Sequence, residues 1–423
     1  MLNPQSVTAT RLNSRRLNVT QELVDPNALD VVTKLKNAGF QALLVGGCVR
    51  DLLLGAAPKD FDVATDATPE DVRRLFRRSR MVGRRFRIAH VRYGRDIIEV
   101  STFRKSVDLE EAGDRKATPD GLILRDNVYG TLDEDAFRRD FTVNALYYDP
   151  HEEEILDFVG GIEDLQAHRL RFIGEPRARL QEDPVRLLRA MRFQAKLGFD
   201  LDAGITDDAE LTAARLMDIP SARLFDEFSK MFLSGYAMNV WKIIEPTPIR
   251  NVLFPATSAD NRLVHLAMQN TDQRIAEGRP VTPGFLLAVL LWDDYQARIS
   301  ELTRNKKINE ARLLAAHEAL AKQRHVLAIP RRFSQFVNDV WQLQERLETR
   351  RARQIQRTLS HPRFRAAYDF LLLRSQAGLF ETRIADWWTE IQETDSTQRE
   401  QMITELAPEP RRKRRRRRQR RQS

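Results

Sequence analysis

The stretch that most constrains this chain is residues 43–63. There an apolar run ends in Gly46 and Gly47, and a second, strand-like run carries Asp60 and Asp62 on either side of a phenylalanine. Because successive strand side chains alternate between faces, the two carboxylates point the same way, with Cα atoms about 6.5 Å apart. Carboxylates this close repel each other, and a divalent cation between them relieves the repulsion. The pattern therefore predicts a cation site, with a solvated strand end as the alternative.

The residues before the carboxylates indicate what else the site binds. A glycine pair between an apolar strand and a short helix lets backbone approach a phosphate closely and presents N–H groups at the helix start. Arg50 on that helix adds a cation. Together with the two carboxylates, this arrangement predicts a site for a nucleoside triphosphate and its metal.

Length and composition set the remaining limits. The 423 residues are enough for about two to four domains, and the 42% hydrophobic residues can form a sizeable core. No apolar run reaches about 18 residues, which predicts no transmembrane helix, and residues 1–20 lack the apolar region of a secretory signal. The single cysteine, Cys48, excludes an intramolecular disulfide and a cysteine-cluster zinc site.

The positive charge is concentrated at one end of the chain. Lys and Arg number 69 against 60 Asp and Glu, a net charge of +9. Residues 411–421 contain ten of the basic side chains and no acidic one, so the rest has 59 against 60, a net of −1. A run of like charges this dense does not fold alone, and it binds RNA or another acidic surface without reading sequence.

Periodicity predicts an α+β head with a small sheet, followed by a helical remainder. Helical periodicity continues almost throughout residues 200–406, where Trp341, Trp387 and Trp388 are expected in the core rather than stacked on RNA. Residues 106–125, rich in charge, Gly, Asp and Pro, are expected to form a mobile loop. The elements predicted for the head are helices at 27–39, 49–54 and 68–78 and strands at 41–45, 61–65, 81–91 and 96–104.

The strand predicted at 96–104 carries a carboxylate among apolar residues. Alternation places Glu99 on the face opposite Ile98. On this pattern alone, Glu99 is either a surface glutamate that faces solvent or a third carboxylate for the site of Asp60 and Asp62.

The periodicity of residues 133–147 predicts one helix with two different faces. Apolar residues recur at i,i+4, Arg139 and Asp140 lie on another face, and Asn144 follows Asp140 by one turn. The residues alone allow an ion-paired surface helix as well as a binding face.

A further charged helix is predicted at 179–193. Glu182 and Arg186 lie at i,i+4, while Asp183 and Arg189 each lie three residues from Arg186, so one face presents acids and guanidiniums. A carboxylate beside a guanidinium offers acceptors and donors to a base edge, much as another base would. The alternative is a solvated helix laced by salt bridges.

These three stretches, taken in order, resemble a known family. The Gly-Gly and Asp-Phe-Asp stretch, the Arg-Arg-Asp-Phe-Thr-Val-Asn-Ala-Leu run and the Glu-Asp-x-x-Arg motif resemble those of the nucleotidyltransferase family that includes bacterial poly(A) polymerases and CCA-adding tRNA nucleotidyltransferases. The resemblance covers residues 41–193. It implies a head of the DNA polymerase beta type with a small mixed sheet, followed by a helical neck, body and RNA-binding region.

The resemblance also implies roles for particular residues. It implies two Mg²⁺ ions at Asp60 and Asp62, with Glu99 or Asp140 completing the catalytic carboxylates. One ion lowers the pKa of the RNA 3′-hydroxyl and the other stabilises the leaving pyrophosphate. ATP is the implied substrate, and the third motif selects its base, chiefly through its Asp and Arg. The residues implied to bind the nucleotide are Gly46, Gly47, Arg50, Arg139, Asn144, Glu182, Asp183, Arg186 and Arg189.

Cations also gather late in the helical part, before the basic tail. In this context they predict an RNA track, with a merely solvated face as the alternative. The predicted RNA-binding residues are Arg331, Arg332, Arg350, Arg351, Arg411, Arg412, Lys413 and Arg414.

Two activities are open within the family. Residues 82–91 are similar to the segment that marks the bacterial poly(A) polymerases, whereas CCA-adding enzymes tend to have a Gly-Thr turn near the position of His90. The basic tail suits an enzyme that holds many RNA 3′ ends, and no His-Asp dipeptide occurs, which excludes the phosphohydrolase domain of some CCA-adding enzymes. The sequence thus favours template-independent polyadenylation of RNA 3′ ends from ATP, which promotes RNA turnover. CCA addition to tRNA and an RNA-binding factor with an inactive transferase head are the alternatives.

The expected organisation has five segments. The expected partners are ATP, the 3′ ends of mRNA, small RNAs and decay intermediates, and the RNA-decay machinery. The expected location is the cytoplasm, with the tail holding the protein at the inner membrane. The segments are a flexible N-terminus at 1–25, a nucleotidyltransferase head at 26–165, a helical neck with base recognition at 166–235, a helical body and RNA-binding region at 236–406, and a disordered arginine-rich tail at 407–423.

Overall fold

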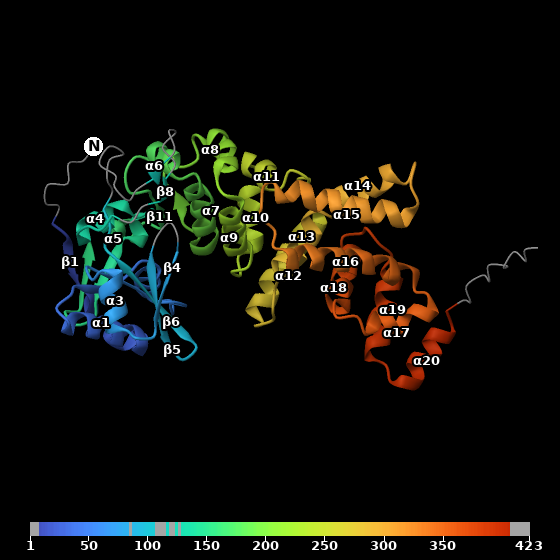
Figure 1. Cartoon of the computed structure of the whole chain (residues 1–423), viewed down its shortest axis with the longest axis horizontal. Helices are drawn as coiled ribbons and strands as arrows, with labels where there is room; N and C mark the ends of the chain where they lie inside the picture. Colours follow the sequence, from blue (N-terminus) through green and yellow to red (C-terminus); the bar gives the residue numbers. More distant parts are fainter. Residues whose placement is uncertain (1–7, 84–86, 106–115, 118–122, 126–127, 407–423) are drawn as a thin grey trace, which may run out of the picture. The chain divides into compact units, whose positions relative to one another are not determined.

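The computed structural model falls into two compact units, an N-terminal unit that ends at Ile219 and a C-terminal unit that begins at Pro220. Figure 1 shows a sheet in the first unit and helices throughout the second. The division falls inside the segment predicted as a neck, 166–235. The predicted tail at 407–423 lies outside the described residues, as does most of the loop predicted at 106–125. The residues described are 8–83, 87–105, 116–117, 123–125 and 128–406.

An eight-stranded mixed sheet organises the N-terminal unit. Its strands lie in the order β1-β10-β9-β2-β3-β6-β5-β4, with β3 and β6 parallel and the other neighbours antiparallel. The sheet and the helices around it confirm the predicted fold class. The strands are β1 (Thr10–Asn13), β2 (Ala42–Val45), β3 (Asp62–Thr65), β4 (Ser79–Val82), β5 (Ile88–Tyr93), β6 (Asp96–Thr102), β9 (Leu146–Asp149) and β10 (Glu154–Asp157), beside two small pairs, β7 (Lys116–Ala117) with β8 (Ile123–Arg125) and β11 (Arg169–Leu170) with β12 (Asp200–Leu201).

Apolar cores form on both faces of this sheet. On one face Val32, Val49 and Val72, from α1, α2 and α3, join the strand side chains in the larger core. On the other face Ala136 of α4 packs with Tyr147 in a smaller core. The helices of the unit are α1 (Pro26–Asn37), α2 (Gly47–Leu53), α3 (Pro69–Leu75), α4 (Leu132–Arg138), α5 (Gly161–Gln166), α6 (Pro176–Glu182), α7 (Val185–Leu197) and α8 (Ala209–Arg215), with 3-10 turns η1 (Ser14–Leu17), η2 (Gln21–Leu23), η3 (Thr142–Asn144) and η4 (Leu216–Asp218).

Local chemistry fixes where the predicted helices begin. The Asp25 side chain accepts hydrogen bonds from the backbone of Asn27 and Ala28, and Pro26 starts α1. Thr68 and Asp71 form a reciprocal capping box at the start of α3. These signals explain why the helices predicted at 27–39 and 68–78 are found, although both end earlier than predicted.

Two predictions about the head need correction. Residues 1–25 were expected to be loosely ordered, but residues 10–13 form β1, which pairs with β10 along the edge of the sheet. The strand predicted at 81–91 is instead two antiparallel strands, β4 and β5, and residues 84–86 between them lie outside the described part of the chain.

The C-terminal unit is helical in its described residues, as predicted. Trp341 and Trp388 are buried and donate their indole N–H to the carbonyls of Ala288 and Leu347, at 3.0 and 2.8 Å, which confirms them as core. Trp387 is only partly buried and packs against the core that contains Trp388. No helix in the described residues combines the length and the apolar character needed to cross a bilayer. The helices are α9 (Ser221–Phe232), α10 (Ala237–Ile244), α11 (Pro248–Leu253), α12 (Arg262–Ala276), α13 (Pro283–Leu290), α14 (Trp292–Leu302), α15 (Ile308–Arg324), α16 (Arg331–Thr349), α17 (Ala352–Leu359), α18 (Phe364–Gln376), α19 (Thr382–Glu393) and α20 (Ser396–Thr404).

Candidate active site

Two of the predicted carboxylates meet where β3 runs parallel to β6. The register pairs Asp62 with Glu99, and Glu99 pairs with His90 on β5. Residues paired in register lie on the same face of a sheet, on strands about 4.8 Å apart. His90 Nε2 lies 3.2 Å from Glu99 Oε1. We call Asp62, Glu99 and His90 the polar row.

The charges at the start of β3 favour a cation. Asp60 is exposed in the bend before the strand, and Phe61 packs into the larger core as predicted. Burial, together with the charges of Glu99 and Asp60, raises the pKa of Asp62 to about 6, although Arg139 lowers it. A divalent cation beside Asp62 would offset this repulsion and favour the ionised carboxylate.

The donor set here fits magnesium. Mg²⁺ prefers oxygen ligands and is usually held by one or two carboxylates together with the phosphates of the substrate. In the described part of the chain, no group of three Asp, Glu, His or Cys side chains could enclose a metal ion. Two carboxylates such as Asp60 and Asp62 fit this mode of binding, in which phosphate oxygens and water supply the other ligands.

The predicted glycine turn follows the strand that pairs with Asp62. Val45 at the end of β2 is in register with Asp62, so Gly46 lies immediately beyond that pair. Gly46 has φ +81° and ψ −127°, a conformation that a side chain strongly disfavours. A Cβ atom on Gly46 would lie 3.5 Å from Arg139 Nη1. The turn therefore brings backbone and the Arg139 guanidinium into contact beside the polar row.

Arg139 is held by Asp135 and Tyr147, neither of which was predicted as a site residue. Its Nε and Nη2 donate to Asp135 Oδ2 at 3.1 and 3.0 Å, and the Tyr147 hydroxyl donates to the same oxygen at 2.8 Å. The Arg139 guanidinium also lies over the Tyr147 ring, 5.2 Å from its centroid. The i,i+4 spacing of Asp135 and Arg139 was a signal for this pair.

The single helix predicted at 133–147 is wrong. Helix α4 ends at Arg138, and Arg139 is extended, with φ −63° and ψ 168°. Asp140 is therefore outside any helix, Asn144 ends the separate turn η3, and the chain then enters β9. The apolar periodicity that suggested one helix comes partly from residues outside α4, such as Phe141, which forms a β-bridge with Phe172.

Arg179 explains where α4 stops. Its Nη2 donates to the backbone carbonyls of Arg138 and Arg139, at 2.8 and 2.5 Å, so a side chain of α6 satisfies the open end of α4. Burial, reinforced by Arg186, lowers the pKa of Arg179 to about 10. Arg179 Nε is buried and has no hydrogen-bond partner among the described residues.

Asp140 lies in a different charge environment from Asp62. The Arg189 side chain donates to Asp140 Oδ2 at 2.7 Å, and the Phe141 backbone N–H donates to Oδ1 at 2.9 Å. Burial would raise the pKa of Asp140, but Arg189 and these hydrogen bonds lower it to about 2. Asp140 and Arg189 are thus engaged with each other.

Arg50 and Asn144, both predicted to contact the nucleotide, contact each other in the structure. Arg50 is 2% exposed, and its Nη1 donates to Asn144 Oδ1 at 2.7 Å. Its Nε and Nη2 donate to Asp51 Oδ1 at 2.8 and 2.6 Å, and Lys196 Nζ of α7 lies 3.1 Å from Asp51 Oδ2. This partly buried network joins α2, η3 and α7.

The third motif spans two helices, so the helix predicted at 179–193 is also wrong. Asp183 has φ −154° and ψ 93°, which breaks the chain between α6 and α7. The residue before a proline disfavours the helical region, and Pro184 supplied that signal. Glu182 Oε2 nevertheless accepts from both Arg179 and Arg186, and Asp183 and Arg186 are 6% and 9% exposed.

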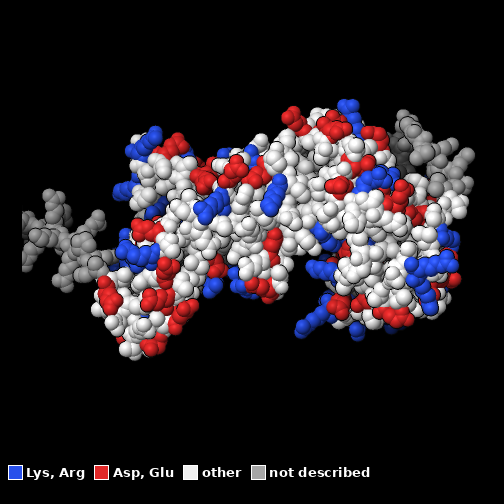
Figure 2. All heavy atoms as spheres, turned by 180° about the vertical axis from the view of Figure 1, so that it is seen from behind, with Lys and Arg blue, Asp and Glu red and all other residues white. Residues whose placement is uncertain are grey.

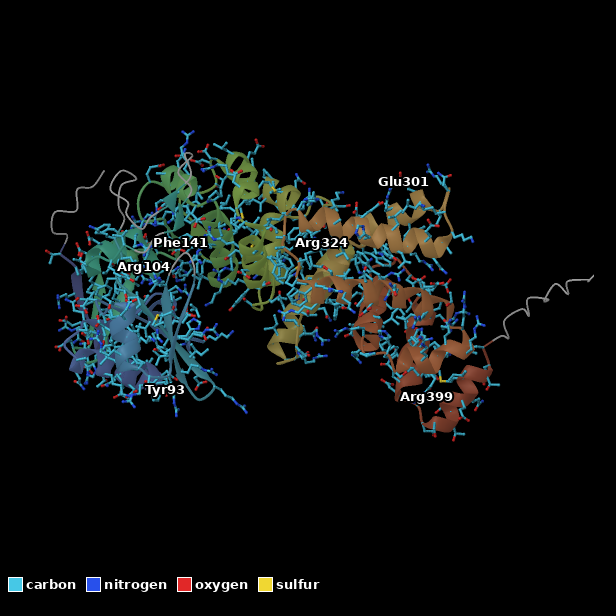
Figure 3. All side chains as sticks on the ribbon, viewed as in Figure 1. Tyr93, Arg104, Phe141, Glu301, Arg324 and Arg399 are labelled. Carbon is cyan, nitrogen blue, oxygen red and sulfur yellow. The ribbon has the colours of Figure 1, made fainter. Side chains whose placement is uncertain are left out.

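One aromatic ring organises the cations of this region. The guanidiniums of Arg50, Arg189 and Arg192 lie 5.2, 5.7 and 4.5 Å from the centroid of Phe193. Phe193 packs edge-on against Phe141, which is labelled in Figure 3, with centroids 5.5 Å apart. The ring thus adds cation–π contacts to Arg50 and Arg189, which are already paired with Asp51 and Asp140.

The RNA-binding residues predicted in the C-terminal unit lie at both ends of α16. Arg331 and Arg332 are exposed at its start, and Arg350 and Arg351 follow its end. A helix of 19 residues separates the two pairs by about 28 Å. Arg350 lies over the Trp387 ring, 5.4 Å from the centroid. Figure 2 shows basic and acidic side chains interspersed on the face it presents, and the predicted residues Arg411, Arg412, Lys413 and Arg414 are outside the described residues.

The fold and this site define a nucleotidyltransferase. The chain is similar to the crystal structure of the Bacillus stearothermophilus CCA-adding enzyme in complex with CTP, with a TM-score of 0.59 and 23% identity over 87% of this chain and 84% of that one. At this identity the likeness concerns the fold. Family models match at residues 42–171 (poly A polymerase head domain), 198–260 (probable RNA and SrmB-binding site of polymerase A) and 304–422 (polymerase A arginine-rich C-terminus).

The sequence comparisons separate the two branches of the family. Poly(A) polymerase I of Haemophilus influenzae is 44% identical over 404 residues, which cover 92% of this chain and 89% of that protein. The CCA-adding enzyme of Lactobacillus helveticus is 38% identical over only 226 residues, 52% of this chain and 53% of that enzyme. The chain belongs to the poly(A) polymerase family, and the sequence-based preference for this branch is confirmed.

Proposed function

We propose that this protein is a template-independent polynucleotide adenylyltransferase. The RNA 3′-hydroxyl attacks the α-phosphorus of ATP, the bond to pyrophosphate breaks, and RNA longer by one AMP is released with pyrophosphate. The observation that carries this proposal is the strand register of Asp62. Asp62 pairs with Glu99 on one side and with Val45, the residue before Gly46, on the other. The carboxylates and the glycine turn therefore lie on neighbouring strands.

Two magnesium ions are assigned to Asp60 and Asp62. When bound, they activate the 3′-hydroxyl and stabilise the charge of the departing pyrophosphate. In this proposal Glu99 is the third catalytic carboxylate, because it lies close enough for its charge to raise the pKa of Asp62. Asp140 is instead paired with Arg189. His90 is a positioning residue that orients Glu99 from the neighbouring strand.

The protein side chains bind and orient the nucleotide. Arg139, fixed by Asp135 and packed on Gly46, faces the triphosphate. Arg50 and Asn144 position the turn through their buried contact with each other. Asp183 and Arg186 select adenine at the junction of α6 and α7, where Glu182 holds the Arg186 guanidinium.

A nucleotide-incorporation assay tests the activity. Purified protein is incubated with Mg²⁺, a generic RNA and one labelled nucleoside triphosphate at a time. Long products from ATP alone support the proposal. Addition of two C and one A to truncated tRNA, followed by a stop, would indicate CCA addition instead. No incorporation of any nucleotide would indicate an RNA-binding factor with an inactive head.

A matched pair of substitutions tests the site. Asp62→Ala removes a proposed metal ligand and relieves charge repulsion, so we expect incorporation to be lost while the fold remains. Asp66→Ala removes an exposed carboxylate just beyond the same strand and should leave incorporation unchanged. Full activity of the Asp62 variant would refute the assignment.

RNA is the second substrate in this proposal. We assign RNA binding to the cations at the two ends of α16 and to residues 411–421, with mRNA, small RNAs and decay intermediates as substrates. The RNA-decay machinery is the proposed partner. We place the protein in the cytoplasm, in keeping with its single buried cysteine, and at the inner membrane through the basic tail.

A further inference from the structure

The C-terminal unit contains a cavity that the active site does not use. Its volume is about 250 Å³, and α12, the start of α13, α16 and α18 line it. Its lining includes Asn270, Arg274, Phe285, Phe336, Arg363, Arg365 and Asp369. The matched family segments at 198–260 and 304–422 leave the first part of this lining unassigned.

The charge of the cavity favours an anion. Three guanidiniums and one carboxylate line it, an excess of two positive charges. Arg365 Nε lies 3.0 Å from Asp369 Oδ1, and Arg274 Nη1 lies 3.3 Å from Oδ2. One acid thus positions two cations without neutralising both, and Arg363, which is exposed, adds a third.

The rest of the lining suits a planar base. Phe285 is half-buried and lines the cavity, and it forms a T-shaped pair with Phe370, with centroids 6.3 Å apart. Phe336 packs closely against Gly284. A Cβ atom at Gly284 would lie only 2.9 Å from Phe336 Cδ1, so no larger residue fits there. The Arg363 guanidinium lies 5.1 Å from the Phe336 centroid, so a second flat group stands at the rim.

The side-chain amide of Asn270 is available to hydrogen-bond with the edge of a base. The Asn270 side-chain amide lines the cavity and makes no hydrogen bond to another described residue. An amide presents one acceptor and two donors, which can pair with the edge of a base, adenine in particular. Aromatic faces, guanidiniums and a free amide are the combination that binds single-stranded RNA.

We propose that this cavity binds one nucleotide of the RNA substrate. The base packs against Phe285 and the Arg363 guanidinium and meets Asn270, and its phosphate lies at Arg365 and Arg274. A free nucleoside monophosphate has the same chemistry, but an RNA chain adds phosphates that the excess positive charge at the rim can bind. This inference rests on the proposed function in taking RNA as the substrate.

Equilibrium binding of a fluorescein-labelled oligo(A) of ten nucleotides tests the proposal with the full chain. Phe285→Leu keeps an apolar side chain against Phe370 but removes the aromatic face, and Arg363→Ala removes an exposed cation. We expect each to weaken binding by about tenfold at about 200 mM salt. Arg262→Ala, an exposed residue of α12 that does not line the cavity, is the control and should stay within about twofold.

Salt dependence separates the two contributions. Arg363→Ala should reduce the slope of log affinity against log salt by about 0.7, because one phosphate contact is lost. Phe285→Leu should leave the slope unchanged. If both variants bind like the Arg262 control, or if Phe285→Leu acts only by lowering the melting temperature, the proposal is overturned.

Two further measurements distinguish the alternatives. If AMP binds to the wild type in a Phe285-dependent way while oligo(A) binding does not depend on Phe285, the cavity is a free-nucleotide site and the RNA proposal fails. Incorporation by the wild type is measured in parallel. Absence of AMP transfer with intact, Phe285-dependent RNA binding would refute the proposed function alone, whereas normal transfer with Phe285-independent binding would refute the cavity alone.

Discussion

Asp135→Asn is the most informative single substitution in the N-terminal unit. Asp135 is the buried anion that holds Arg139, and the asparagine keeps its shape while removing its charge. The side chains of Asp135 and Arg139 are 7% and 22% exposed. Breaking a buried pair by removing one partner costs about 3–5 kcal/mol, because the other charge remains buried. Arg139 keeps some exposure and the nearby Asp62 charge, so we expect the lower end, about 3 kcal/mol.

Urea denaturation measures this loss. With an m-value of about 3 kcal/mol/M, the unfolding midpoint of the N-terminal unit should fall by about 1 M. Circular dichroism follows both units, whereas tryptophan fluorescence reports the C-terminal unit, because all five tryptophans lie beyond residue 219. We also expect AMP incorporation to fall, since Arg139 loses the partner that orients it.

The matched control is Glu154→Gln. Glu154 pairs with Arg11 at 2.7 Å, but both side chains are partly exposed, and such pairs contribute about 0–1 kcal/mol. The double variant Asp135→Asn/Arg139→Met should be less destabilised than Asp135→Asn alone, because the unpaired cation is gone. A loss below about 1 kcal/mol for Asp135→Asn, or no recovery in the double variant, would refute the reasoning.

The remaining predictions concern the turn, the base site, the metal and pH. Gly46→Ala forces a side chain into φ +81°, at about 1–3 kcal/mol, and should abolish incorporation while circular dichroism stays native. Asp183→Asn should raise the incorporation of CTP relative to ATP, measured with single nucleotides, and unchanged selectivity would contradict the assignment of Asp183. EDTA should stop incorporation and excess Mg²⁺ should restore it. Because the pKa of Asp140 is lowered to about 2 from about 3.9, its stabilising contribution is present above pH 4 and is lost as the pH falls towards 2, so the stability difference between wild type and Asp140→Asn should shrink over that range.

The sequence predicted well what depends on neighbours along the chain. The helix near 27–39 has a capping aspartate and a proline at its start, and the alternation at 96–104 placed Glu99 opposite Ile98, as burial in β6 confirms. The glycine turn was found because a conformation like that of Gly46 leaves little choice of residue. In each case a few adjacent side chains determine the local backbone.

The errors have a different origin. At 133–147 the helical periodicity is real, but Arg179, forty residues away, caps the carbonyls of Arg138 and Arg139, and the following residues pair with the sheet. A short-range pattern cannot reveal a partner that distant. At 179–193 the proline signal was present, yet charge spacing was taken as evidence for one continuous helix, because Glu182 and Arg186 also fit an i,i+4 pair.

The site also shows why residue type alone could not assign roles among the carboxylates. Asp62 and Asp140 are both partly buried acids near arginines, but the strand register places Asp62 next to Glu99, whereas a salt bridge joins Asp140 to Arg189. The first carboxylate has its pKa raised and the second has it lowered. A cation therefore gains most beside Asp62, where the protein leaves negative charge unbalanced, and Asp140 is better suited to hold α7 against the motif that carries Arg139.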